Sequence, residues 1–285
     1  MSSQNGSASD FTPKLERLEL TSLVTLHCRA CDAELGDRSV LSDNVSHRIS
    51  AKIGSMLDGL GTNPTRVFNV ALRTKYLDSV VGDFARRYPE GCVVDLGSGF
   101  DPRAERCGLR PPFGWFGVDS PAVNDARRRM YEESDEFLID GDLRGGEWLS
   151  GLDRERPTIL VADGLFPFLP ADSMRALMRS MGAWFSTAEL TFNGYSRLMG
   201  RMMQRSKTFR AMGISPDDGL RSGRDLEGWG AGLKLLDETY LWRMPEVASM
   251  ESPGRIWTRL LGSTKRTARN GPWILHYRFE ERETS

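Results

Sequence analysis

The chain has 285 residues, a length that suits one large α/β domain or one such domain with an added cap. Its 38 basic and 39 acidic side chains nearly cancel, so the overall charge gives no sign of a nucleic-acid partner. No stretch approaches the roughly 18 apolar residues of a membrane span, and the polar start lacks the features of a signal peptide. We therefore expect a cytoplasmic protein whose partner is neither a nucleic acid nor a membrane.

The first part of the chain is expected to be helical. Residues 1–14 are interpreted as a disordered tail, and apolar residues recur at helical spacing over 15–60 and again over 69–88. Cys28 and Cys31 form a C-x-x-C pattern, but no second pair of metal ligands follows it. Because residues three apart lie on one face of a helix, the two cysteines are interpreted as core residues, and no metal is expected.

Strands and helices alternate after residue 91. Short apolar runs predict strands at 92–96, 115–119, 137–140, 158–162 and 188–192. The clearest helix between them spans 171–185, and alternation of this kind is typical of a mostly parallel sheet with helices on both faces. The alternating run 273–279 is expected to add an antiparallel strand.

The same pattern suggests how the chain is organised. We expect one domain over 15–285, which contains N-terminal helices (15–90), a core that binds the ligand (91–194), a cap inserted after the fifth strand (195–250) and a segment that completes the sheet (251–285). A cap at the carboxyl end of a strand lies where substrates bind in open α/β sheets.

A glycine-rich turn follows the first predicted strand, with the pattern D-x-G-x-G-x-D from Asp95 to Asp101. The second predicted strand ends on Asp119. Glycines allow the backbone to approach a ligand, and a carboxylate at the next strand end accepts both hydroxyls of a ribose. A dinucleotide fingerprint fails because its sixth position is Pro102, and no phosphate-binding Gly-Lys-Ser/Thr follows. The pattern resembles the first motif of S-adenosylmethionine-dependent methyltransferases, although taken alone it also fits a purely structural turn.

Further segments resemble one family, in the same order along the chain. They are Thr25–Ala30 with Leu41–Asp43, Leu72–Asp78, Asp95–Arg103, Gly117–Pro121, Val161–Leu169 and Leu226–Leu233. On these segments the chain resembles the leucine carboxyl methyltransferase family, in its branch of bacterial polyketide O-methyltransferases of the tetracenomycin type. The resemblance implies a class I methyltransferase fold, which is a Rossmann-like α/β fold, and S-adenosylmethionine as the cofactor.

The resemblance also implies cofactor contacts. Gly97 and Gly99 would lie along the methionine part of the cofactor, and Asp119 would accept both ribose hydroxyls. Asp142 would accept a hydrogen bond from the adenine amino group, and Leu143 would pack on the ring. For Asp119, the alternative is a helix cap before a proline.

Two more residues are implied on the methionine side. Arg73 would pair with the cofactor's carboxylate, because guanidinium groups suit carboxylates; the alternative is an ion pair with Asp78 or Asp101. Asp163 would orient the cofactor's amino group, although the family usually has a glutamate there, so its side chain reaches one methylene less.

The implied reaction is transfer of a methyl group to oxygen on a small natural product. Tyr195, Arg197 and Trp229 in the cap are candidate acceptor contacts. No histidine is assigned as a base, so the catalytic residues stay unknown, and a carboxylate acceptor is weakly preferred because it is already ionised at neutral pH. The alternatives are methylation of a peptide or protein C-terminal carboxylate, and a non-catalytic scaffold that binds adenosine or a partner. The sequence leaves the oligomeric state open.

Overall fold

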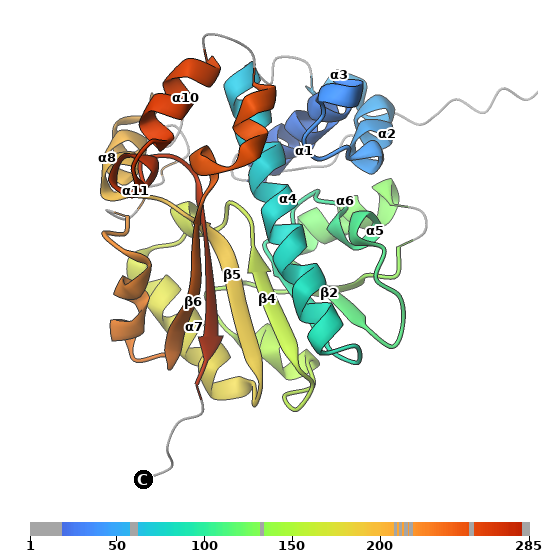
Figure 1. Ribbon diagram of the computed structural model, residues 1–285. Coiled ribbons are helices and arrows are strands. Elements are labelled where there is room, and N and C mark those ends of the chain that lie inside the picture. The colour runs from blue at the N-terminus through green and yellow to red at the C-terminus, as the bar shows by residue number, and fades with distance from the viewer. Residues whose placement is uncertain are drawn as a thin grey trace, which may run out of the picture.

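A seven-stranded sheet forms the centre of the computed structural model, which describes residues 19–57, 62–131, 134–207, 210, 213, 216, 219–250 and 254–280 (Figure 1). The predicted tail over 1–14 lies outside the described residues. The strands are β1 (Cys92–Leu96), β2 (Gly114–Asp119), β3 (Phe137–Asp140), β4 (Thr158–Ala162), β5 (Ala188–Gly194), β6 (Leu233–Tyr240) and β7 (Trp273–Phe279). They are arranged in the order β3-β2-β1-β4-β5-β7-β6.

Helices surround this sheet. They are α1 (Leu20–Ala33), α2 (Asn44–Lys52), α3 (Gly54–Leu57), α4 (Pro64–Arg87), α5 (Arg103–Cys107), α6 (Pro121–Met130), α7 (Ala171–Trp184), α8 (Arg197–Arg205), α10 (Gly254–Gly262) and α11 (Lys265–Ala268). Short 3-10 turns are η1 (Gly36–Arg38), η2 (Glu147–Gly151), η3 (Phe166–Phe168), η4 (Gly223–Trp229), η5 (Leu241–Arg243) and η6 (Pro245–Ser249). None of the helices in the described ranges is both long and apolar enough to cross a bilayer.

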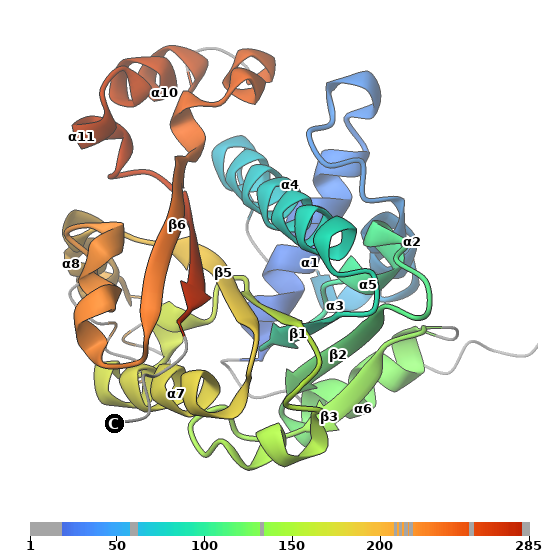
Figure 2. The same cartoon turned by 60° about the horizontal axis from the view of Figure 1, so that its bottom comes forward.

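The central strands are buried on both faces, which explains their continuous apolar sequences. Strands β1 to β5 pair in parallel, and β7 runs antiparallel to both β5 and β6, as predicted for 273–279. On one face Leu72 and Leu77 of α4 pack with Val93, and on the other Met178 of α7 packs with Val94. Figure 2 shows α4 and α7 on opposite sides of the sheet. The expected class I methyltransferase architecture is therefore confirmed.

Two parts of the chain differ from the prediction. The helical stretch over 15–60 is broken, because Asp43 accepts a hydrogen bond from the Ser46 amide at 2.9 Å and so begins α2. Part of the predicted cap belongs to the sheet, since β6 pairs with β7 as an edge strand. The cap elements outside the sheet are therefore α8 and the short turns around it.

The carboxyl ends of β1, β2, β4 and β5 share one edge of the sheet. Figure 1 shows α1, α2, α3 and α10 at that end of the molecule, above the strands. In open α/β sheets this is the edge that binds ligands. The arrangement brings the glycine turn and the predicted strand-end residues beneath a helical cover.

Candidate active site

The glycine turn after β1 and the carboxylate at the end of β2 are joined by hydrogen bonds. Gly97 and Gly99 have φ of +65° and +52°, in the left-handed region that favours glycine. Asp119 accepts from the Gly99 amide through Oδ2 and from the Ser120 amide through Oδ1, both at 2.7 Å. Burial raises the pKa of Asp119, while these two bonds act in the opposite direction. The carboxylate is thus fixed beside the turn, as ribose binding requires.

The beginning of α1 covers the turn closely. A Cβ at Gly99 would lie 2.8 Å from Ser22 Cβ, so only glycine fits this approach. Ser120 both caps α6, by accepting from the Val123 amide at 3.3 Å, and donates to Glu19 Oε1 at 2.5 Å. Helix α1 is therefore tied to the strand end that carries Asp119.

Arg73 and Asp163 come together from α4 and the end of β4. Arg73 Nε lies 2.7 Å from Asp163 Oδ1 as an ion pair, so Arg73 pairs with neither Asp78 nor Asp101. Yet neither atom has a hydrogen-bond partner within the described part of the chain, although both are buried. A buried cation and anion with unused hydrogen-bonding capacity fit the carboxylate and amino groups of an amino acid.

The two residues expected near adenine face different surroundings. Leu143 is buried, and a Cβ at Gly97 would lie 3.8 Å from its Cδ1, so Leu143 lies beside the glycine turn. Asp142 is exposed and accepts two hydrogen bonds from Arg144 Nε, at 2.9 and 3.0 Å. The hydrogen bonds from Arg144 lower the pKa of Asp142. The structure brings Leu143 to the site but turns the Asp142 carboxylate toward Arg144.

The three candidate acceptor residues are not brought together. Tyr195 follows β5 and lines an apolar hollow with Phe166 and Phe192. Arg197 begins α8, and its Nε is buried without a hydrogen-bond partner among the residues described. Trp229 instead packs on α7, where the Arg175 guanidinium lies 5.3 Å from its ring centroid. Only Tyr195 and Arg197 therefore lie at the carboxyl end of a strand.

Comparisons with known proteins agree with this geometry. The model of the family described as leucine carboxyl methyltransferase matches residues 58–182, which include the glycine turn, Asp119 and Asp163. A Streptomyces glaucescens protein, described as tetracenomycin polyketide synthesis O-methyltransferase TcmP, is 28% identical over 238 residues, covering 83% of this chain and 88% of that protein. Over residues 58–182 the chain is therefore similar to the leucine carboxyl methyltransferase family.

Two further proteins show how far this likeness extends. The Gibberella zeae S-adenosyl-L-methionine-dependent methyltransferase dpfgK is 26% identical over 245 residues, which cover 78% of this chain and 82% of that protein. The crystal structure of an inferred methyltransferase from Thermobifida fusca superposes with a TM-score of 0.52 at 13% identity, covering 89% and 94% of the two chains, and so shares the fold. The expectation of an S-adenosylmethionine-dependent methyltransferase is confirmed.

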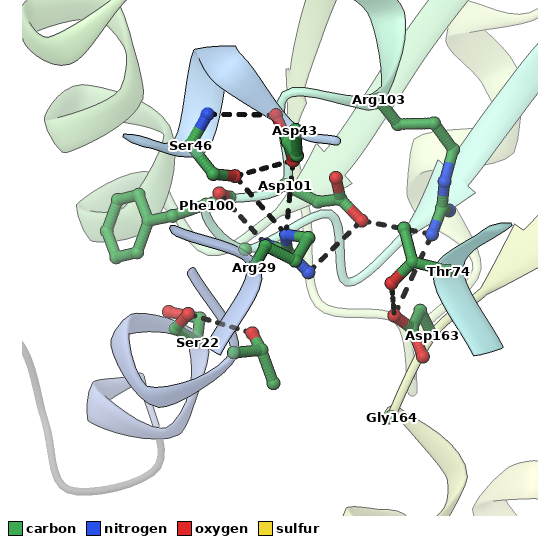
Figure 3. Close-up of polar contacts among 12 residues, drawn as sticks. Ser22, Arg29, Asp43, Ser46, Thr74, Phe100, Asp101, Arg103, Asp163 and Gly164 are labelled. Atoms are coloured by element: carbon green, nitrogen blue, oxygen red, sulfur yellow. Dashed lines mark hydrogen bonds and ion pairs between the residues drawn. The ribbon is translucent and has the colours of Figure 1, made fainter. Parts of the chain in front are cut away.

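The glycine turn continues into a buried ionic network (Figure 3). Arg106 Nη1 lies 2.7 Å from Asp43 Oδ2 and 2.9 Å from Asp101 Oδ1, and its Nε lies 2.7 Å from Asp78 Oδ2. Arg29 of α1 lies 3.4 Å from Asp101. Although burial opposes ionisation of Asp101, the surrounding guanidinium groups hold its pKa well below the usual range. The network ties the N-terminal helices to the turn.

Sequence reasoning missed most of this network. The side chain of Arg29, for example, is 1% exposed and donates to Phe100 O at 3.2 Å. Arg103 and Arg106 received no role. The available signal was their spacing of three on a short helix directly after an acidic turn, which places both guanidinium groups on one face.

Proposed function

We propose that this enzyme methylates an oxygen of a small natural product, with a carboxylate as the preferred acceptor group. The observation that carries the proposal is the convergence of the glycine turn, Asp119 and the Arg73–Asp163 pair at one edge of the sheet. The name of the Streptomyces glaucescens relative, a polyketide synthesis O-methyltransferase, supports this substrate class. A cytoplasmic location stays a prediction.

Each residue has a distinct task toward the cofactor. S-adenosylmethionine supplies an electrophilic methyl group when bound. Asp119 would accept hydrogen bonds from the ribose hydroxyls, and Leu143 would contact the adenine ring. Arg73 and Asp163 would bind the carboxylate and amino groups of the methionine part. Because the donor is intrinsically reactive, the protein contributes mainly alignment and exclusion of water.

The preference for a carboxylate rests on the acceptor side of the site. The Arg197 guanidinium forms no ion pair within the described ranges, and its Nε is buried without a hydrogen-bond partner. An acceptor carboxylate would form an ion pair with the guanidinium and accept a hydrogen bond from Nε. Because it is already ionised at neutral pH, it needs no base. The three histidines are engaged elsewhere: His276 contacts Glu189 at 2.8 Å, His47 lies 3.8 Å from Glu34, and His27 lies beside Cys31.

Exposed apolar side chains support an apolar body for this acceptor. Helix α8 exposes Leu198 and Met202, and α10 exposes Ile256 and Trp257. Figure 1 shows both helices on the same side of the molecule, near the carboxyl end of the sheet. Exposed apolar side chains that form one contiguous patch mark a site of interaction with a ligand or partner.

The pH dependence of a single turnover tests the acceptor chemistry. With a carboxylate acceptor the rate is expected to be flat from about pH 6 to 8, well above an ordinary carboxyl pKa. With a phenol the rate would rise as the hydroxyl or an enzyme base loses its proton. The product gives a second readout, because mild alkali hydrolyses a methyl ester but leaves an aryl methyl ether intact. An alkali-stable product would overturn the carboxylate preference and leave the methyltransferase assignment standing.

A further inference from the structure

Asp163 is held by more groups than its ion pair with Arg73. Its Oδ1 lies 2.7 Å from Arg73 Nε, whereas Oδ2 lies 3.5 Å from Thr74 Oγ1 and 3.8 Å from Arg103 Nη2 (Figure 3). The side chain of Asp163 is 8% exposed. The two oxygens therefore have different neighbours: one faces Arg73, and the other faces a hydroxyl and a second guanidinium.

Arg103 is a rigid neighbour because three nearer carboxylates fix it. Its Nε lies 2.9 Å from Asp78 Oδ1, its Nη1 lies 3.0 Å from Asp95 Oδ2, and its Nη2 lies 3.0 Å from Asp101 Oδ2. Its side chain is 1% exposed. A planar guanidinium held at three points cannot follow a movement of Asp163. Its positive charge therefore stays in one place and attracts Oδ2 to a fixed position.

Thr74 adds a directional contact from a different element. Its side chain lies on α4, next to Arg73, and is fully buried. Its hydroxyl donates to the same Asp163 oxygen that faces Arg103. Two independent elements, α4 and α5, thus draw Oδ2 away from the position where Oδ1 and Arg73 meet.

We propose that Arg103 and Thr74 are positioning residues that hold Asp163 Oδ2, so that Oδ1 and Arg73 are presented to the amino and carboxylate groups of the cofactor. This inference rests on the proposed function of the Arg73–Asp163 pair. It adds a specific claim: these two buried residues act on the amino-acid part of the ligand and not on its adenosine part. Placement within fractions of an ångström governs such contacts.

Two ligands distinguish effects on the amino-acid part of the cofactor from effects on its adenosine part. S-adenosylhomocysteine carries both the adenosine and the amino acid, whereas 5′-methylthioadenosine keeps the adenosine and the thioether but lacks the amino acid. Isothermal titration calorimetry of the full chain gives both dissociation constants. For Arg103→Lys we expect S-adenosylhomocysteine to bind about tenfold more weakly, as for one weakened charge-assisted hydrogen bond, while 5′-methylthioadenosine binds as in the unaltered enzyme.

Arg106→Lys is the matched control. Arg106 lies on the same helix and shares Asp78 and Asp101 with Arg103, but none of its ion pairs reaches Asp163. Its replacement disturbs the same network, so a general loosening of the fold would affect both ligands in both variants. We expect the ratio of the two dissociation constants to stay unchanged in Arg106→Lys.

Thr74→Val is a second test of the inference, which applies even if Arg103→Lys does not fold. This variant preserves shape and removes only the hydroxyl, and we expect about a threefold loss for S-adenosylhomocysteine alone. Thr74→Ser, which restores the hydroxyl, is expected to restore the affinity. If folded Arg103→Lys and Thr74→Val enzymes keep the ratio of the two dissociation constants of the unaltered enzyme, the inference is overturned. Failure of the unaltered enzyme to bind either ligand would instead overturn the proposed function.

Discussion

Asp119→Asn tests the ribose site most directly. The carboxylate accepts one backbone hydrogen bond on each oxygen, both at 2.7 Å. An amide keeps one acceptor and turns an N–H₂ group toward the other donor, so one charge-assisted bond is lost, worth about 1.5–3 kcal/mol. Burial already opposes the charge of Asp119, so the neutral amide regains part of this loss. We expect the free energy of unfolding to fall by about 1–2 kcal/mol.

The effect on binding is expected to be larger and to depend on the ribose. Loss of one charge-assisted bond to a ribose hydroxyl corresponds to about 10- to 150-fold weaker binding. S-adenosylhomocysteine and 5′-methylthioadenosine both contain the ribose, so calorimetry is expected to show the same factor for each. Asp140→Asn is the control, because Asp140 pairs in register with Asp119 on β3 but its side chain is 45% exposed. A folded Asp119→Asn enzyme that keeps its affinity within about twofold would refute the ribose assignment.

Two further expectations concern stability and the acceptor. Burial raises the pKa of Asp95 to about 7 in the folded enzyme, so the folded state holds a proton that the unfolded state has released, and the free energy of unfolding should fall as pH rises from about 4 through 7. In denaturant unfolding of Asp95→Asn, the free energy of unfolding should depend less steeply on pH over this range. An unchanged slope would mean that other groups cause the pH dependence. Arg197→Ala is expected to raise the acceptor KM about tenfold or more with an unchanged dissociation constant for S-adenosylhomocysteine. Trp229 lies in η4 and packs against α7, so Trp229→Phe is expected to leave both quantities unchanged. An altered acceptor KM in this variant would show that Trp229 contributes to the acceptor site.

The sequence was most informative where local pattern determines structure. Strands β1, β3, β4 and β7 begin and end at the predicted residues, because short apolar runs between turns leave few alternatives. Strand β6 was missed because it is half-exposed and its pairing shifts between Leu235 and Asp237, which interrupts the alternation. A single interrupted edge strand gives little periodic signal.

The site divides in the same way. Gly97, Gly99 and Asp119 could be predicted because a turn and the next strand end are near neighbours in both sequence and space. The contact of Thr74 with Asp163 joins residues 89 positions apart, and spacing within one segment cannot reveal it. The turning of Asp142 toward Arg144 depends on local geometry that no motif records.

The direction of β7 has a practical consequence for work with the enzyme. Because β7 runs antiparallel to β5, the chain leaves the sheet at the edge opposite the glycine turn, and Figure 1 shows β7, the dark red arrow, ending far from α1 and α10. A fluorescent label, a fusion partner or a linkage to a sensor surface attached beyond Phe279 therefore leaves the ligand-binding edge facing solution. Surface-based measurements of ligand exchange can be oriented through this end.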